Sequence, residues 1–224
     1  PREQEAALEQ AGQKRRGKKP KQPDDKPDPK AQRNFTDPES RIMKDGASKS
    51  FEQAYNCQAA VDETAQVIVA TNVTQETNDK QQVKPLIENL KERNGGQTPR
   101  RASADSGHFS ERNVEYLQNE RIDGYIATGR LKHGAEAPAA PRGRIPQTAT
   151  VKDRMARKLR TVKGRSTYKK RKQIVEPVFG QIKEGRGIRR LLLRGRANVT
   201  AEWDLICLTH NLLKLFRSLA PQFA

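Results

Sequence analysis

The sequence predicts an α/β fold in which a mixed sheet is flanked by helices. Two observations support this prediction. Three strand-like segments follow one another between residues 36 and 74, and strand-like and helix-like segments then alternate. Consecutive antiparallel strands followed by strand–helix alternation are typical of a mixed sheet covered by helices.

The three predicted strands at the start of the fold differ in how clearly the sequence marks them. Residues 36–44 combine a turn with a short strand, and residues 51–61 alternate as a half-buried strand does. Residues 66–74 are rich in β-branched side chains, which favour strands. The short polar segment 62–65 joins the last two strands, so we expect them to form a hairpin.

Helices and short strands are predicted to alternate after residue 75. Asn78 or Asp79 can cap a helix that runs from residue 80 to about residue 93. The elements predicted after it are a strand at 101–104, a helix capped by Ser110, a strand at 124–128 and an amphipathic helix at 199–219.

The chain is predicted to divide into a linker and one domain. Residues 1–33 are charged and rich in Pro, which predicts a disordered basic linker. Residues 34–219 form the predicted domain. Within it, residues 130–165 are basic and rich in Gly and Pro, and we expect them to form a loop insertion.

The net charge points to a polyanionic partner. Its value of +17, from 44 Lys and Arg against 27 Asp and Glu, favours nucleic acid. No apolar run approaches the length that spans a bilayer, so we expect no membrane association. Cys57 and Cys207 are distant in sequence, and two separate buried thiols in a reducing compartment are expected.

The stretch from Ile174 to Lys183 carries a charge pair on one helix face. Glu176 and Lys183 are seven residues apart, about two helical turns, and apolar residues between them can dock the helix on a core. Such an acid can hold a metal, and such a base can hold a phosphate. The alternative is an ordinary amphipathic helix whose Glu and Lys are solvated.

Candidate acidic residues elsewhere fit a two-metal phosphoryl-transfer site, which needs carboxylates at the ends of neighbouring strands. Asp105 follows a predicted strand, and Ser106-Gly107 allows a sharp turn beside a ligand. The first acid is either Asp37, at the start of the first predicted strand, or Asp62, at the end of the second. Strand counting favours Asp37, because Asp62 suits a hairpin turn at the opposite end of the sheet.

These motifs together resemble the catalytic domain of the DDE transposases of bacterial insertion sequences. The likeness runs from about residue 34 to residue 216. It rests on residues 36–44 (TDPESRIMK), 55–62 (YNCQAAVD), 104–107 (ADSG) and 175–183 (VEPVFGQIK).

The resemblance implies an RNase H-like fold, Mg²⁺ or Mn²⁺, and cutting and strand transfer of double-stranded DNA at the ends of a mobile element. It places Asp37, Asp105 and Glu176 as the catalytic, metal-binding triad. Lys183, Arg171 and Lys172 are the expected phosphate contacts. Tyr168 and Arg171 lie one residue further upstream of Glu176 than the related signature places them.

The same resemblance implies a homo-oligomer on DNA and a cytoplasmic, nucleoid-associated protein. We also expect the family's N-terminal DNA-binding domain to be missing from this chain. The alternative to an active transposase is a non-catalytic DNA-binding remnant, which the charge alone supports.

Overall fold

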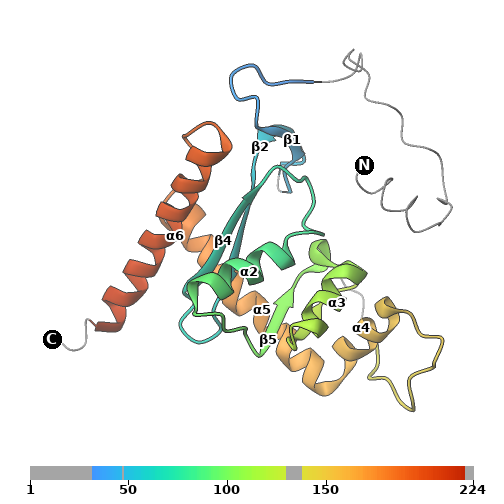
Figure 1. The fold of residues 1–224 in the computed structure, drawn as a ribbon. Coiled ribbons are helices and arrows are strands. Elements are labelled where there is room, and N and C mark those ends of the chain that lie inside the picture. The colour runs from blue at the N-terminus through green and yellow to red at the C-terminus, as the bar shows by residue number, and fades with distance from the viewer. Residues whose placement is uncertain (1–31, 47, 130–137, 220–224) are drawn as a thin grey trace. The chain divides into compact units, whose positions relative to one another are not determined.

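The computed structural model describes residues 32–46, 48–129 and 138–219 (Figure 1). The chain divides into two units, Pro1–Arg33 and Asn34–Ala224, of which the second contains every element described below. The predicted linker at residues 1–33 lies, except for Gln32 and Arg33, outside the described residues.

The described part of the chain is a mixed α/β structure, as predicted. Its strands are β1 (Arg41–Lys44), β2 (Phe51–Ala54), β3 (Asn56–Val61), β4 (Ile68–Thr74), β5 (Arg101–Ala104) and β6 (Asp123–Ile126). Its helices are α2 (Val83–Arg93), α3 (Glu111–Asn119), α4 (Val151–Arg160), α5 (Val162–Gly180) and α6 (Arg196–Leu219).

The strands form three separate pairs among the described residues. β1 pairs with β2 and β3 pairs with β4, both antiparallel, whereas β5 and β6 are parallel. The β3–β4 pairing confirms the predicted hairpin. The parallel pair requires a crossover, which α3 provides.

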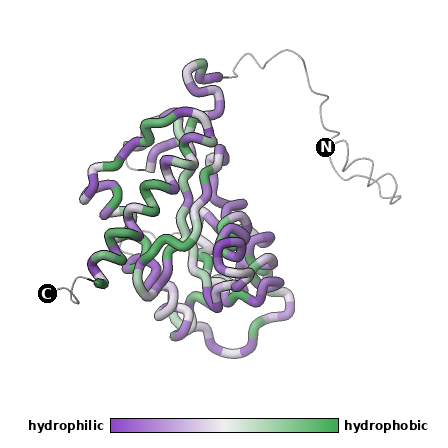
Figure 2. The backbone as a smooth tube through the Cα atoms, turned by 60° about the vertical axis from the view of Figure 1, so that its left-hand side comes forward, coloured by the Kyte–Doolittle hydropathy of each residue, from purple (hydrophilic) through white to green (hydrophobic). Residues whose placement is uncertain are grey.

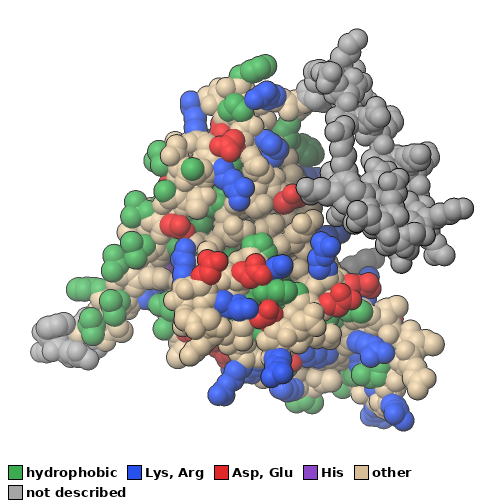
Figure 3. All heavy atoms as spheres, in the orientation of Figure 1, with side chains coloured by type: hydrophobic (Ala, Val, Ile, Leu, Met, Phe, Trp, Pro, Cys, Tyr) green, Lys and Arg blue, Asp and Glu red, His purple; other side chains and the backbone are tan. Residues whose placement is uncertain are grey.

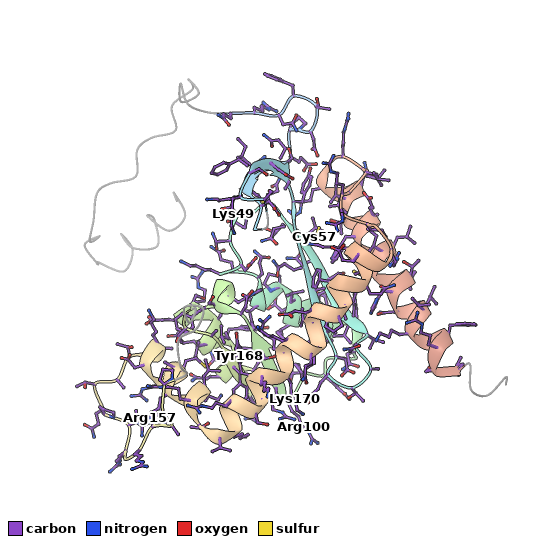
Figure 4. The ribbon with its side chains drawn as sticks, turned by 180° about the vertical axis from the view of Figure 1, so that it is seen from behind. Lys49, Cys57, Arg100, Arg157, Tyr168 and Lys170 are labelled. Carbon is purple, nitrogen blue, oxygen red and sulfur yellow. The ribbon has the colours of Figure 1, made fainter. Side chains whose placement is uncertain are left out.

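Two hydrophobic clusters hold these pairs in place. The first joins the β3–β4 hairpin to α5 and α6 through Val73, Val178, Val199 and Trp203. The second, which includes Ile126 and Leu117, joins β6 to α2, α3 and α4. Figures 1 and 4 show α2 and α5 on opposite sides of β4, so helices cover the strands from both sides.

The last helix is amphipathic, as predicted, and it begins at Arg196 rather than Val199. In Figure 2, hydrophobic and hydrophilic colours alternate along it. Asn211 makes hydrogen bonds with both the backbone N–H and the backbone carbonyl of Ile68, which fix the helix to the start of β4. Across the residues that the structure describes, no helix has both the length and the apolarity that crossing a bilayer requires.

The prediction of a single strand over residues 51–61 is wrong. The segment breaks at Tyr55 into β2 and β3. The physical reason is a change of partner, because β2 pairs with β1 whereas β3 pairs with β4. At the break, the Tyr55 hydroxyl donates to the carboxylate of Asp37 at 2.8 Å.

The predicted start of the first helix is also wrong. The helix begins at Val83, and its N-cap residue, Gln82, makes no side-chain capping bond. Asp79 does not cap the helix because its carboxylate accepts hydrogen bonds from two amides of β3 instead. The predicted Ser110 cap is confirmed, since its hydroxyl accepts the backbone N–H of Asn113.

The predicted loop at residues 130–165 is helical over much of its length. Residues 130–137 lie outside the described part, but residues 151–160 form α4 and α5 begins at Val162. Thr150 and Asp153 form a reciprocal capping box at the start of α4, and Met155 is buried beneath it. Basic composition concealed this helix from the prediction.

The junction of α4 and α5 requires glycine at residue 164. A Cβ there would lie 2.0 Å from the carbonyl oxygen of Lys158, which is backbone and cannot move aside cheaply. We expect Gly164→Ala to lower the free energy of unfolding by about 1–3 kcal/mol, measured by urea denaturation. The matched control is Gly180→Ala in the same helix.

A Cβ at Gly180 would meet nothing within 4 Å, and its backbone is already helical. Alanine there is expected to leave stability unchanged or to raise it by up to about 1 kcal/mol. Equal stabilities of the two alanine variants would contradict this account of the α4–α5 junction.

Candidate functional site

The candidate site lies where β5 ends. Asp105 follows the strand and begins a 3-10 turn, Ser106–His108. Its Oδ1 atom accepts the backbone N–H of Gly107 at 2.9 Å and lies 2.9 Å from Nδ1 of His108. The carboxylate is 47% exposed, so it is fixed by the turn and still open to a ligand.

The charge of Asp105 is stabilised by its neighbours. The hydrogen bond with His108 is the main cause that lowers the pKa of Asp105 to about 2, assisted by the charge of His108, the N–H of Gly107 and the charge of Arg171. Burial opposes the shift. Asp105 is therefore ionised throughout the physiological range.

A second carboxylate, Asp79, reaches the same place from the segment after β4. Its Oδ1 atom accepts hydrogen bonds from Asn56 Nδ2 and Gln58 Nε2, each at 2.7 Å. A Cβ on residue 107 would lie 2.8 Å from Asp79 Oδ2. The absence of a side chain at Gly107 is thus what allows the Asp79 carboxylate to approach the Asp105 turn.

Gln58 connects Asp79 to His108. The side chain is buried, with 8% exposure. Its Nε2 donates to Asp79, and its Oε1 lies 3.1 Å from Nε2 of His108. Its backbone carbonyl accepts the indole N–H of Trp203 at 3.0 Å, which links the site to the first hydrophobic cluster.

The hydrogen bonds fix the role of His108. Its two ring nitrogens face oxygen acceptors, one on Asp105 and one on Gln58. The Gln58 amide cannot be reversed, because its nitrogen donates to Asp79 and Asn56. Which ring nitrogen donates depends on the tautomer, and either tautomer donates to one of these two oxygens. Through these two contacts His108 orients Asp105.

The site nevertheless fits a divalent cation. One ligand atom each from Asp79, Asp105 and His108 lies within 4.8 Å of the others. Among the described residues, the hydrogen bonds of both carboxylates are made by Oδ1, and no donor reaches Oδ2 of either. Oxygen donors of this kind suit Mg²⁺ and Mn²⁺.

Asp37, the predicted first acid, lies outside this group. It is buried, both of its carboxylate oxygens accept the Tyr55 hydroxyl, and Oδ1 also accepts the backbone N–H of Gly195 at 3.3 Å. Burial, followed by the hydrogen bond to Asp37, raises the pKa of Tyr55 well above its usual range. Asp37 thus ties the first strand pair to the start of α6.

Asp62, the alternative first acid, lies at the other end of the β3–β4 hairpin. Its Oδ2 atom accepts the backbone N–H groups of Thr64 and Ala65, each at 2.8 Å. Gln58, which touches the site, is four residues away along β3, or about 13 Å. The carboxylate of Asp62 therefore stabilises the hairpin turn.

Glu176 is exposed on α5, and Pro177 follows it within the helix rather than at its first position. Its carboxylate is not part of the Asp79–Asp105–His108 group. Downstream of Pro177, α5 continues into a π-helical turn, Gln181–Gly185, which contains Lys183. Lys183 lines a cavity of about 400 Å³ together with Asp79, Asn56 and Cys57.

Of the other predicted phosphate contacts, Arg171 lies nearest to the acids, since its charge contributes to the low pKa of Asp105. Its guanidinium stacks over the Tyr168 ring at 5.6 Å, and its buried Nε has no hydrogen-bond partner among the described residues. Arg171 and Val175 line a second cavity, of about 860 Å³. Lys172 is exposed on α5.

Sequence reasoning missed two residues of the site. His108 is mostly buried and bridges the turn after β5 to β3. Asp79 was interpreted as a helix cap. The available signal was the polar pair Asn56 and Gln58, which alternates on a strand face and needs buried partners.

An α/β structure with paired carboxylates at a strand end is suited to binding a cation beside a polyanionic substrate. A family model described as the transposase DDE domain matches residues 18–212, most of the chain. The chain therefore belongs to the transposase DDE domain family. Neither a curated protein nor a solved structure matches it. DNA is the substrate that the family implies.

The link between His108 and Asp105 can be tested by titration. We expect His108→Phe, which keeps a ring and removes both nitrogens, to raise the pKa of Asp105 from about 2 towards 3.8. Carboxyl NMR of Asp105 measures this directly. The low pKa stabilises the folded state above the ordinary pKa, and this contribution fades as pH falls from about 4 to about 2.

His210→Phe is the matched control, because His210 is a buried histidine that contacts Gln181 and Gln66 instead. It should leave the Asp105 titration unchanged. An unchanged Asp105 pKa in the His108 variant would show that the hydrogen bond does not set the charge of the site.

Proposed function

We propose that this chain is the catalytic domain of a DDE transposase that cuts DNA and transfers strands in a metal-dependent reaction, and so moves an insertion sequence. The observation that carries the proposal is the meeting of Asp79 and Asp105 at the end of β5. Family membership supplies the context.

We further propose that the fold is RNase H-like. In its support, the order of elements is strands, then α2, β5, α3 and β6, and the β5–β6 pair is parallel. Asp105 then occupies the carboxyl end of a parallel strand, where ligands of α/β sheets bind. The order of all the strands within one continuous sheet remains part of the proposal.

Asp79 and Asp105 would hold Mg²⁺ or Mn²⁺ through their Oδ2 atoms. The bound ion would stabilise charge on the phosphate and activate the attacking water or 3′-hydroxyl. His108 keeps Asp105 ionised and oriented, and Gln58 and Asn56 keep Asp79 in place. Asp37 and Glu176 remain the predicted first and third acids, and Lys183 the predicted phosphate contact.

Basic side chains on α4 and α5 would track the DNA backbone without reading its sequence. Lys172 is exposed on α5, and Arg171, one residue before it, lies close enough to Asp105 to help lower its pKa. Lys158 on α4, by contrast, forms a salt bridge with Asp123, with an Nζ–Oδ1 distance of 2.5 Å. Arg171 is therefore the basic residue of α5 whose charge reaches the proposed metal site.

The decisive experiment is a cleavage and strand-transfer assay with Mn²⁺ on DNA bearing element ends. Because each acid would supply charge that no other group replaces, Asp105→Asn, Asp79→Asn and Glu176→Gln should each lower activity by at least about 100-fold. Asp37→Asn tests the first acid. Asp62→Asn is the control, since its carboxylate serves the hairpin turn.

Calorimetric titration with Mn²⁺ separates metal binding from catalysis. Asp79→Asn and Asp105→Asn should each weaken Mn²⁺ binding, whereas Asp62→Asn should not. Full activity of Asp105→Asn would refute the proposal.

The second candidate is a DNA-binding remnant without catalysis. Two observations favour it: Glu176 lies outside the acidic group, and the Asp37 carboxylate is occupied by Tyr55 and Gly195. It predicts that the parent chain binds Mn²⁺ and DNA and cuts nothing.

Either candidate predicts DNA binding that weakens steeply with salt. If Lys172 contacts a phosphate, Lys172→Gln should reduce the slope of log K against log salt by about 1. Lys84→Gln is the control, because Lys84 pairs with Glu88 on α2, on the other side of β4. Filter binding across a salt series gives both slopes, and equal slopes would exclude Lys172 from the DNA contact.

A further inference from the structure

The outer face of α6 carries an uninterrupted apolar stripe. Its members are Leu205, Leu208, Leu212, Leu215, Phe216 and Leu219, with exposures between 38% and 70%. Figure 3 shows hydrophobic side chains gathered along the edge of the molecule that α6 forms. Exposed apolar patches of this extent are uncommon on monomeric proteins.

The stripe is distinct from the face that packs on the core. Val199, Trp203, Ile206, Cys207 and His210 are the buried residues of α6, and they face the β3–β4 hairpin and α5. The helix therefore has two apolar faces. The described part of the chain covers one of them and leaves the other exposed.

The spacing of the stripe identifies the kind of partner. The five leucines recur at intervals of three, four, three and four residues, which is the a/d pattern of a helix that packs against another helix. The stripe contains no charged residue, although the chain as a whole carries +17. A second helix of the same kind meets no charge repulsion along this seam.

The sizes along the stripe favour an antiparallel arrangement. Bulky Phe216 and Leu219 lie near its C-terminal end, whereas small, exposed Ala201 continues it at the N-terminal end. Two copies related by a twofold axis beside residue 210 would pair Leu205 with Leu215, Leu208 with Leu212, and Ala201 with Leu219. Leucine then faces leucine in the two central pairs, and small Ala201 leaves room for Leu219 at each end, so the seam is self-complementary.

A groove next to the stripe could receive a side chain from the second copy. It lies between α6 and residues 186–192, has a volume of about 600 Å³, and is lined by Leu192, Leu205 and Ile206 among others. Antiparallel pairing brings the Phe216 end of one copy to the Leu205 end of the other. Phe216 is then placed to fill this groove.

The stripe is large enough for a specific interface. Six half-exposed side chains per copy would bury on the order of 1,000 Å² in total, the lower bound for a specific interface.

We propose that this chain forms a twofold dimer through antiparallel packing of α6 against α6 of a second copy. The proposal concerns assembly and stands whether or not the chain cuts DNA. If the chain is a transposase, the dimer would place two catalytic domains on one assembly. That is what joining two element ends requires.

The first test is oligomeric state by sedimentation equilibrium, with nuclease-treated protein in about 0.5 M salt so that nucleic acid cannot bridge copies. The parent chain should be a dimer. Leu208→Glu/Leu212→Glu should raise the dimer dissociation constant at least about 100-fold, because four charges enter the seam of each dimer.

The control is Ile145→Glu/Val162→Glu, which also replaces two exposed apolar residues, both outside α6. It should leave the dimer intact. Circular dichroism and a urea transition would show that both variants fold as the parent does. A monomeric parent, or a dimer that persists in Leu208→Glu/Leu212→Glu, would overturn the proposal. Coverage of the stripe by another segment of the same chain would appear as the first of these outcomes.

Cysteine cross-linking tests the direction. In the antiparallel dimer the two Leu205 positions lie about 15 Å apart, so Leu205→Cys alone should not form a disulfide-linked dimer. A mixture of Leu205→Cys and Leu215→Cys chains should cross-link. The opposite result would show that the helices pack in parallel.

Discussion

The buried amide of Gln58 is the interaction on which the candidate site depends. It donates to Asp79, faces His108 through its oxygen, and through its backbone accepts Trp203. These three partners come from the segment after β4, the turn after β5, and α6. A single side chain on β3 therefore aligns parts of the molecule that belong to different hydrophobic clusters.

The electrostatic design of the site follows from this alignment. Two carboxylates converge near one imidazole in a strongly basic protein. Such a position attracts a divalent cation, while the surrounding Lys and Arg side chains attract a polyanion. The low pKa of Asp105 shows that His108 stabilises the ionised carboxylate more than burial destabilises it.

The two apolar faces of α6 serve different purposes in this account. One face holds the site in position, because Trp203 packs in the first hydrophobic cluster and donates a hydrogen bond to the backbone carbonyl of Gln58. The other face is available for a second copy. The same helix would thus join the dimer interface to the site, so that no loop would have to move for the one to reach the other.

The sequence by itself determined the mixed α/β class, the β3–β4 hairpin, the strand before Asp105 and the helix capped by Ser110. These features depend on local patterns such as β-branched content, caps and short polar turns, which nearby residues encode. It also predicted the transposase family, because four short motifs carried that likeness over most of the chain. The helix α4 escaped prediction because its basic composition masked a local capping box.

Only the tertiary structure decided which acids meet. Asp37, Asp105 and Glu176 were selected from motifs, yet Asp79 joins Asp105, Asp37 bonds to Tyr55, and Glu176 faces solvent. The reason is that the meeting depends on contacts between residues far apart in sequence, from 21 positions for Gln58 with Asp79 to 50 for Gln58 with His108. It also depends on a glycine whose missing Cβ makes room for a distant carboxylate. No local pattern encodes such a contact, because it exists only once the strands and helices have packed.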